Sequence, residues 1–131
     1  DVEAAECVAT FSEHSESVTS VAFAPNGMLA SGSIDATVRL WDVEAAECVA
    51  TFSEHSESVT SVAFAPNGML ASGSRDATVR LWDVEAKKCL FTLTQHEEGV
   101  GAVAFSADGT MLAVGGPDIS IFALPSSWPS A

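Results

Sequence analysis

Ser31-Gly-Ser-Ile-Asp-Ala-Thr-Val-Arg-Leu-Trp-Asp42 is the stretch that decides the fold, because it returns at positions 72–83 with a single change. The change places Arg75 where the first copy has Ile34. Two short apolar runs flank a polar segment that contains an Asp and a Thr. This pattern predicts a strand, a tight turn and a second strand that ends in Trp-Asp.

The chain is an internal repeat with a period of 41 residues. Residues 1–41 and 42–82 agree at 40 of 41 positions, and residues 83–124 form a third, diverged copy. A period of this size is typical of four-stranded units that are repeated around a ring. We therefore expect three repeats, followed by a tail at 125–131 whose two prolines and missing strand pattern predict a loose end.

Each repeat has the pattern of an all-β unit. Apolar residues alternate over short runs that are bounded by Gly, Pro, Asn, Asp and Ser, which is typical of strands rather than helices. In the first repeat we expect four strands, near residues 7–11, 18–24, 28–33 and 37–41. A Pro-Asn-Gly sequence at 25–27 predicts the turn between the second and third strands.

The composition favours a folded acidic protein. Hydrophobic residues make up 47% of the chain, and 18 acidic residues against 5 basic ones give a net charge of -13. That charge repels phosphate backbones and anionic membranes, so we expect neither nucleic acid nor a membrane as a partner. No apolar run is long enough for a membrane span. The acidic surface either attracts a basic patch on a protein partner or keeps the chain solvated.

Cys7, Cys48 and Cys89 occupy one position of the repeat. An odd number of cysteines, one per repeat and within an apolar run, predicts small hydrophobic side chains rather than disulfides. The close Cys or His spacing of a metal site is missing, and we expect neither a metal nor a cofactor. Free thiols favour a reducing compartment, so we expect a cytoplasmic location.

The repeated strings resemble WD40 repeats, which are the blades of β-propellers. The resemblance is carried by Val18-Thr-Ser-Val-Ala-Phe-Ala-Pro-Asn-Gly-Met-Leu-Ala-Ser-Gly-Ser33, by the turn Asp35 and by Arg39-Leu-Trp-Asp42, and the same strings return in the second repeat. It implies blades of four antiparallel strands. It also implies that the first strand of each repeat is the outer strand of the preceding blade, so the third blade lacks an outer strand and the strand near Cys7 lacks a blade.

A recurring His, Ser and Asp look like a catalytic triad. One substrate needs one asymmetric site, so identical repetition argues for a structural role, and we predict no catalytic residue. In the WD40 family a His, a Ser or Thr, an Asp and a Trp form a buried hydrogen-bond network. The tetrads that the resemblance implies are His14, Ser31, Asp35 and Trp41, then His55, Ser72, Asp76 and Trp82, with Ser33 and Ser74 as alternative serines.

The third repeat keeps only part of this set. His96 and Asp118 remain, whereas Val114 and Phe122 stand where the other repeats have Ser and Trp. We therefore expect a weaker or missing network there, replaced by apolar packing.

The exchange of Ile34 for Arg75 is the main hint of recognition. In WD40 proteins this position and two on the innermost strand face ligands, although an exposed turn also tolerates neutral drift. The candidate positions of such a face are Ser17, Thr19 and Ile34, then Ser58, Thr60 and Arg75, then Gly99, Gly101 and Pro117.

Three blades do not close a propeller, which usually has four to eight. An open arc would expose apolar sheet faces, so we expect association of chains through the leftover strands, as a dimer of six blades or a trimer of nine. The expected function is a non-enzymatic scaffold for protein–protein interaction. Two alternatives stay open. One is an engineered or recently amplified repeat protein whose main property is self-assembly. The other, favoured by a start at Asp1 within a repeat, is a fragment of a longer propeller with a small-ligand or enzymatic site in its channel.

Overall fold

The computed structural model describes residues 5–94 and 99–124. The predictions for His96 and for the tail at 125–131 therefore lie outside the described residues. Strands, turns and loops make up the described part of the chain, which contains no helix that could cross a membrane.

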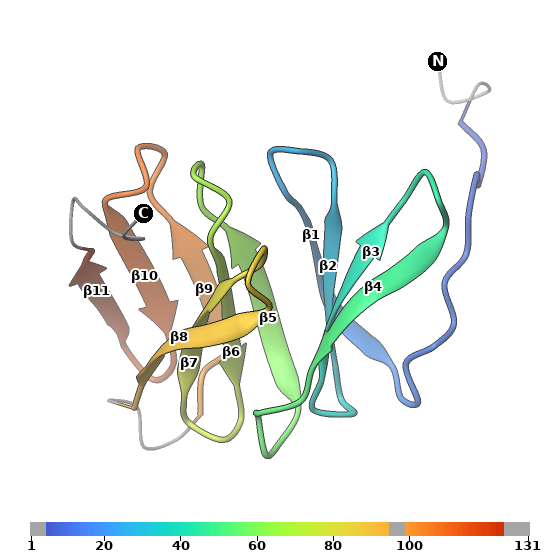
Figure 1. Cartoon of the computed structure of the whole chain (residues 1–131). Helices are drawn as coiled ribbons and strands as arrows, with labels where there is room; N and C mark the ends of the chain where they lie inside the picture. Colours follow the sequence, from blue (N-terminus) through green and yellow to red (C-terminus); the bar gives the residue numbers. More distant parts are fainter. Residues whose placement is uncertain (1–4, 95–98, 125–131) are drawn as a thin grey trace.

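Three antiparallel sheets stand side by side (Figure 1). The first sheet contains β1 (Val18–Phe23), β2 (Leu29–Ser33), β3 (Val38–Asp42) and β4 (Glu47–Phe52). The second contains β5 (Val59–Phe64), β6 (Leu70–Ser74), β7 (Val79–Asp83) and β8 (Lys88–Leu93). The third contains β9 (Ala102–Phe105), β10 (Met111–Gly115) and β11 (Ile119–Ala123). Each sheet pairs its strands in chain order, and we call the three sheets blades 1, 2 and 3.

Turn chemistry sets the register of the two innermost strands. Between β1 and β2 the Asn26 carboxamide accepts a hydrogen bond from the Met28 N–H, and the Ala24 N–H donates to the Met28 carbonyl over 2.7 Å. An Asn side chain that bonds the backbone two residues on is a common turn device. The turn places Phe23 opposite Leu29 and Val21 opposite Ser31, and blade 2 repeats the same pairing.

The N-terminal segment corrects one expectation, whereas blade 3 has the strands that were expected. The strand predicted near residues 7–11 is wrong for the chain by itself, because residues 5–11 form no strand. Blade 3 has three strands in the described residues, with no outer strand beside β11. A lone strand has no ladder hydrogen bonds and is not stable by itself. Figure 1 shows residues 5–14 at one end of the row of blades and β11 at the other.

The apolar core lies between the blades rather than within one sheet. One cluster joins Val38 and Leu40 of blade 1 to Val59 and Val62 of blade 2, and a second joins blades 2 and 3. Hydrogen bonds cross the first of these interfaces as well, since the Ser20 hydroxyl accepts from the Val62 N–H over 3.1 Å. Blades therefore stabilise one another by apolar burial with added polar ties.

Candidate functional site

Four side chains of blade 1 form one hydrogen-bonded chain. The indole N–H of Trp41 donates to Ser31 Oγ over 2.8 Å, and Ser31 Oγ lies 2.6 Å from His14 Nε2. His14 Nδ1 lies 2.9 Å from Asp35 Oδ2. Because an indole N–H can only donate, the Ser31 hydroxyl is free to donate onward to the imidazole. The imidazole then donates from Nδ1 to the carboxylate.

Blade 2 contains the same arrangement. Trp82 Nε1 lies 2.8 Å from Ser72 Oγ, which lies 2.7 Å from His55 Nε2, and His55 Nδ1 lies 3.0 Å from Asp76 Oδ2. Ser72 has no exposed surface, and His55 is 4% exposed. A hydroxyl that a substrate cannot reach, and that already accepts a hydrogen bond from an indole, is poorly placed to act as a nucleophile.

Each network also fastens the loop that enters the blade. The Ser15 N–H donates to Asp35 Oδ2 over 3.0 Å, and the Ser56 N–H does the same to Asp76. In each blade the ring of the histidine lies edge-on to the indole of the tryptophan. The loop before the innermost strand is therefore held to the turn between the second and third strands.

Hydrogen bonding keeps the two aspartates ionised. Burial by itself raises the pKa of Asp76, but hydrogen bonds from Thr78, Ser56 and His55 outweigh it and lower that pKa to about 2. The balance has the same sign at Asp35, whose pKa lies well below its ordinary range. Burial lowers the pKa of His55 despite its carboxylate partner. A neutral imidazole beside an ionised carboxylate fits the donor order described above.

Two threonines belong to these networks and were missed from the sequence. Thr37 Oγ1 donates to Asp35 Oδ1 over 2.5 Å, and Thr78 repeats this bond to Asp76. A Thr two residues after a turn Asp is a local signal that could have identified them. The alternative serines have another partner: Ser33 Oγ donates to the Ser17 carbonyl over 2.9 Å and accepts from the Asp35 N–H.

Blade 3 has an apolar replacement at the equivalent place. Val114 is fully buried in the cluster between blades 2 and 3, and Phe122 packs against the same cluster. Asp118 is exposed, and its carbonyl accepts from the Gly116 N–H. The structure therefore does not bring Asp118 into a buried network with these residues.

The candidate recognition residues lie on the edge formed by the loops between blades and the turns after β2, β6 and β10, which is the lower edge in Figure 1. Ser17, Ile34 and Arg75 are exposed there. Thr19 and Thr60 instead reach across to the next blade, where each hydroxyl donates to a backbone carbonyl over 2.5 Å, that of Val59 and Val100 respectively. We call this edge the loop face.

A hollow of about 530 Å³ opens on the loop face between blades 2 and 3. It brings together five of the nine candidate positions: Thr60, Arg75, Gly99, Gly101 and Pro117. Glu57 also lines it. The other four candidates, Ser17, Thr19, Ile34 and Ser58, lie outside its lining.

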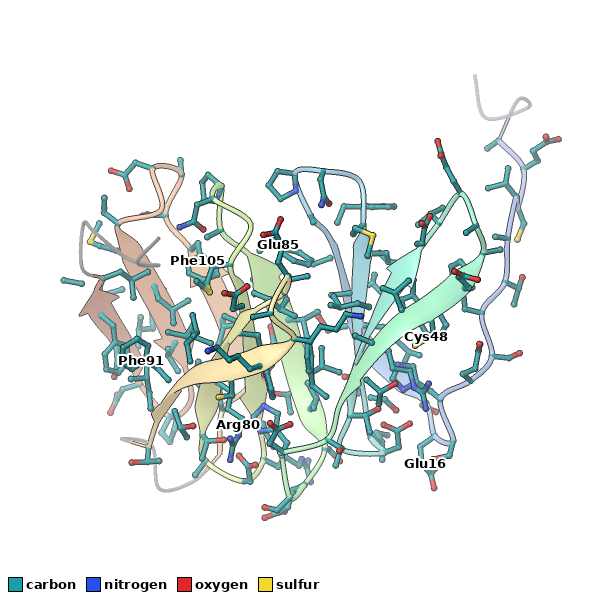
Figure 2. All side chains as sticks on the ribbon, viewed as in Figure 1. Glu16, Cys48, Arg80, Glu85, Phe91 and Phe105 are labelled. Atoms are coloured by element: carbon teal, nitrogen blue, oxygen red, sulfur yellow. The ribbon has the colours of Figure 1, made fainter. Side chains whose placement is uncertain are left out.

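Acidic side chains are frequent on the loop face, and one of them, Glu57, lines the hollow. Glu13, Glu16, Glu54 and Glu57 are all exposed on the loops that enter blades 1 and 2. Figure 2 shows Glu16 at the lower edge of the molecule and Glu85 toward the opposite edge. Arg75, which lines the hollow, carries the opposite charge to these carboxylates. In the described residues, no group of three or more His, Cys, Asp or Glu side chains could hold a metal ion.

Comparison with known protein families identifies the class of these blades. The model of the WD domain, G-beta repeat, matches residues 5–42, 46–83 and 87–122. These three matches cover most of the chain, which therefore belongs to the WD40-repeat family. WD40 repeat proteins in general are non-enzymatic scaffolds that mediate protein–protein interaction.

Proposed function

We propose that this chain is a non-enzymatic interaction scaffold that closes its blades into a ring by self-association and presents the loop face to protein partners. Membership of the WD40 family supports the scaffold role. The geometry of blade 1 supports self-association.

The observation that carries the proposal is the difference between β1 and β5, which have the same sequence. Val18 and Val21 on β1 are 48% and 61% exposed, whereas Val59 and Val62 on β5 are 0% and 5% exposed. Blade 1 covers the β5 residues, whereas none of the residues that the structure describes covers those of β1. A contiguous apolar face of this kind marks a protein interface. A ring of blades would bury it in the way that the chain already buries β5.

The oligomeric state of the full chain tests this proposal. Sedimentation equilibrium at micromolar concentration should give two or three times the 13.5 kDa of one chain. Salt should strengthen association, because it screens the repulsion between chains of net charge -13. A 13.5 kDa species at all concentrations and salt levels would overturn the ring.

The loop face supports a second part of the proposal, which is recognition of a partner with a basic segment. Four exposed glutamates attract positive charge, and Arg75 offers one bidentate donor to a carboxylate at the edge of the hollow. Comparison of partners captured by the wild-type chain and by Arg75→Ile tests the contribution of this side chain. Ile34→Arg is the matched control, since it makes the opposite change of charge at the equivalent position one blade away. An identical set of partners for all three proteins would exclude recognition through this position.

We assign the two networks centred on Asp35 and Asp76 a structural role in holding the loops between blades. Their burial and their complete hydrogen bonding support this role. We also place the protein in the cytoplasm, because its thiols at Cys7, Cys48 and Cys89 are free and such thiols persist in reducing compartments.

A further inference from the structure

The edge strand of blade 3, β11, has no outer strand paired with it in the described residues. Phe105, Leu112 and Phe122 are paired across blade 3 as Phe64, Leu70 and Trp82 are across blade 2, so Ile119 and Ile121 correspond to Val79 and Leu81. Val79 and Leu81 are 1% and 2% exposed in the cluster between blades 2 and 3, whereas Ile119 and Ile121 are 77% and 59% exposed. Blade 3 therefore presents two large apolar side chains on the face where blade 2 carries the next blade, and it has no outer strand beside them in the described residues.

The N-terminal segment has the sequence of an outer strand but is not paired with any blade in the described residues. Residues 5–14 repeat the sequence of residues 46–55, which contain β4. Phe11 stacks on Trp41 with ring centroids 4.7 Å apart, as Phe52 at the end of β4 stacks on Trp82 at 4.4 Å. The segment is thus anchored on blade 1 at its C-terminal end. Val8 nevertheless stays 82% exposed, because no strand in the described part of the chain pairs with this segment.

Within the chain, a valine of one blade packs against a glycine of the blade before it, and the two end blades have the unpaired halves of this contact. A Cβ atom built on Gly32 would meet Val59 Cγ1 at 2.5 Å, and one built on Gly73 would meet Val100 Cγ1 at 2.5 Å. Gly115 takes the place of Gly73 on β10, but the nearest atoms to its built Cβ belong to Ala102 at 3.8 Å. The space over Gly115, which we call the glycine socket of blade 3, is therefore not filled by a valine of the described residues. Val18, the equivalent of Val59, contacts no such glycine among them.

We infer that a second copy of this chain completes blade 3, with residues 9–11 of one copy paired along β11 of the next. This inference deepens the proposed self-association. Transfer of the β3–β4 register places Ile119 opposite Phe11, Ser120 opposite Thr10 and Ile121 opposite Ala9. Val18 of the incoming copy then fills the socket at Gly115.

Charge permits this contact despite the acidity of the chain. Residues 6–11 contain one ionisable carboxylate, Glu6, and residues 119–123 contain no charged side chain. The register places Glu6 opposite Ala123, at the end of the contact. The strand pairing therefore brings no like charges face to face.

The closing interface differs from the two internal ones in its hydrogen bonds. Thr60 and Ser61 of blade 2 both bond to the backbone of blade 3, at the Val100 carbonyl and the Val103 N–H. Blade 3 has Gly101 and Ala102 at these places, which have no side-chain hydroxyl. The contact between copies is therefore mainly apolar, and it is weaker than the contacts within a chain.

Cysteine pairs test the register in the full chain. On a Cys7→Ser background, Thr10→Cys with Ser120→Cys should join copies through a short thiol cross-linker, since directly opposed side chains in a sheet lie close together. Ser12→Cys with Ser120→Cys is the matched control, displaced by two residues on the same face, and should cross-link far less. If the protein is oligomeric but both pairs react equally, or the control pair reacts better, the register is wrong.

Two substitutions on blade 3 test the socket. Gly115→Leu should leave the far-ultraviolet circular dichroism spectrum and the melting temperature of the dilute chain unchanged. It should raise the dissociation constant of the oligomer at least tenfold. Gly101→Thr with Ala102→Ser should lower that constant, because it restores the two hydroxyls of the internal interfaces. Unchanged association of an oligomeric Gly115→Leu protein would overturn the inference but not the ring. A monomeric wild-type chain would overturn both the inference and the proposed ring. Further blades of the same polypeptide would then be the partner of β11.

Discussion

Strands β1 and β5 have the same six residues, Val-Thr-Ser-Val-Ala-Phe, yet one lies at the surface and the other in the core. Val18 is 48% exposed and Val59 is fully buried. The strands have the same local turn and the same pairing register with the strand that follows. Their surroundings differ in that blade 1 packs against β5, whereas no blade of the described residues packs against β1 in the same way.

This difference shows that in a repeat protein burial depends on the neighbouring unit. A blade buries one face on the blade before it and the other on the blade after it, so stability is approximately a sum of terms for adjacent pairs. The end blades then have faces that are built for a neighbour. Blade 3 shows the same effect, with Ile119 exposed where Val79 is buried.

The largest expected effect breaks the comparison directly. Val59→Asp places an uncompensated charge in the interface between blades 1 and 2, so we expect it to destabilise the fold by about 3 to 5 kcal/mol. Val18→Asp, the same change on β1, should alter the stability of the dilute chain by less than about 0.5 kcal/mol and abolish association. Urea denaturation of both variants measures the difference. Equal losses would mean that the two strands have the same environment in solution.

A second comparison sets blade 2 against blade 3. Asp76→Ala removes the acceptor of Thr78, Ser56 and His55, so we expect a loss of about 1 to 3 kcal/mol. Asp118→Ala, at an exposed side chain, should cost less than about 0.5 kcal/mol. Thermal melting of the two variants provides the measurement. An unchanged melting temperature for Asp76→Ala would contradict a structural role of the network.

Acid should act on the networks of blades 1 and 2. The pKa of His55 lies below its ordinary value of 6.5, so just below pH 6.5 the unfolded chain binds more protons than the folded one and stability falls as pH falls. The Asp76 contribution is present above pH 3.8 and is lost as pH falls from 3.8 to about 2. Melting temperatures measured from pH 7 to pH 2 should show both declines.

The matching control for the pH series is the variant that lacks the titrating ring. His55→Gln should have a lower melting temperature at neutral pH and a smaller decline just below pH 6.5. A decline of the same size in both proteins would assign the acid sensitivity to other groups.

The smallest expected effect concerns the position where the repeats differ. Arg75 is exposed, so Arg75→Ile should change stability by less than about 0.5 kcal/mol. The variant makes the first two repeats identical, and any change in partner binding then belongs to this side chain. A loss of more than 1 kcal/mol in chemical denaturation would instead show that Arg75 supports the fold.

Much of the fold could be predicted from the repeat itself. The period, the Pro-Asn-Gly turns and the alternating apolar residues all favour four short antiparallel strands, and blades 1 and 2 have them. These features depend on neighbours close in sequence, and local side-chain chemistry is enough to identify them. The apolar packing of Val114 and Phe122 in blade 3 was expected from comparison with the network that the resemblance to WD40 repeats implies.

Other features depend on contacts between residues that are distant in the chain. Thr37 and Thr78 also contact His14 and His55, because the fold brings a loop within reach of a turn. Thr19 and Thr60, expected on a recognition face, instead bond to the following blade. The segment at residues 7–11 has the sequence of a strand but forms none, since it has no sheet to pair with.

The sequence by itself determined the repeat and most of its strands and turns, because these follow from periodicity and from local side-chain chemistry. The residues of the two hydrogen-bonded networks were implied by the resemblance to WD40 repeats. Only the tertiary structure decided which copy of an identical strand is buried, which hydroxyls tie blades together and which edge lacks a partner. The physical reason is that burial and hydrogen bonding depend on the atoms nearby in space. Two identical stretches of chain differ in that respect as soon as one of them lies at an end.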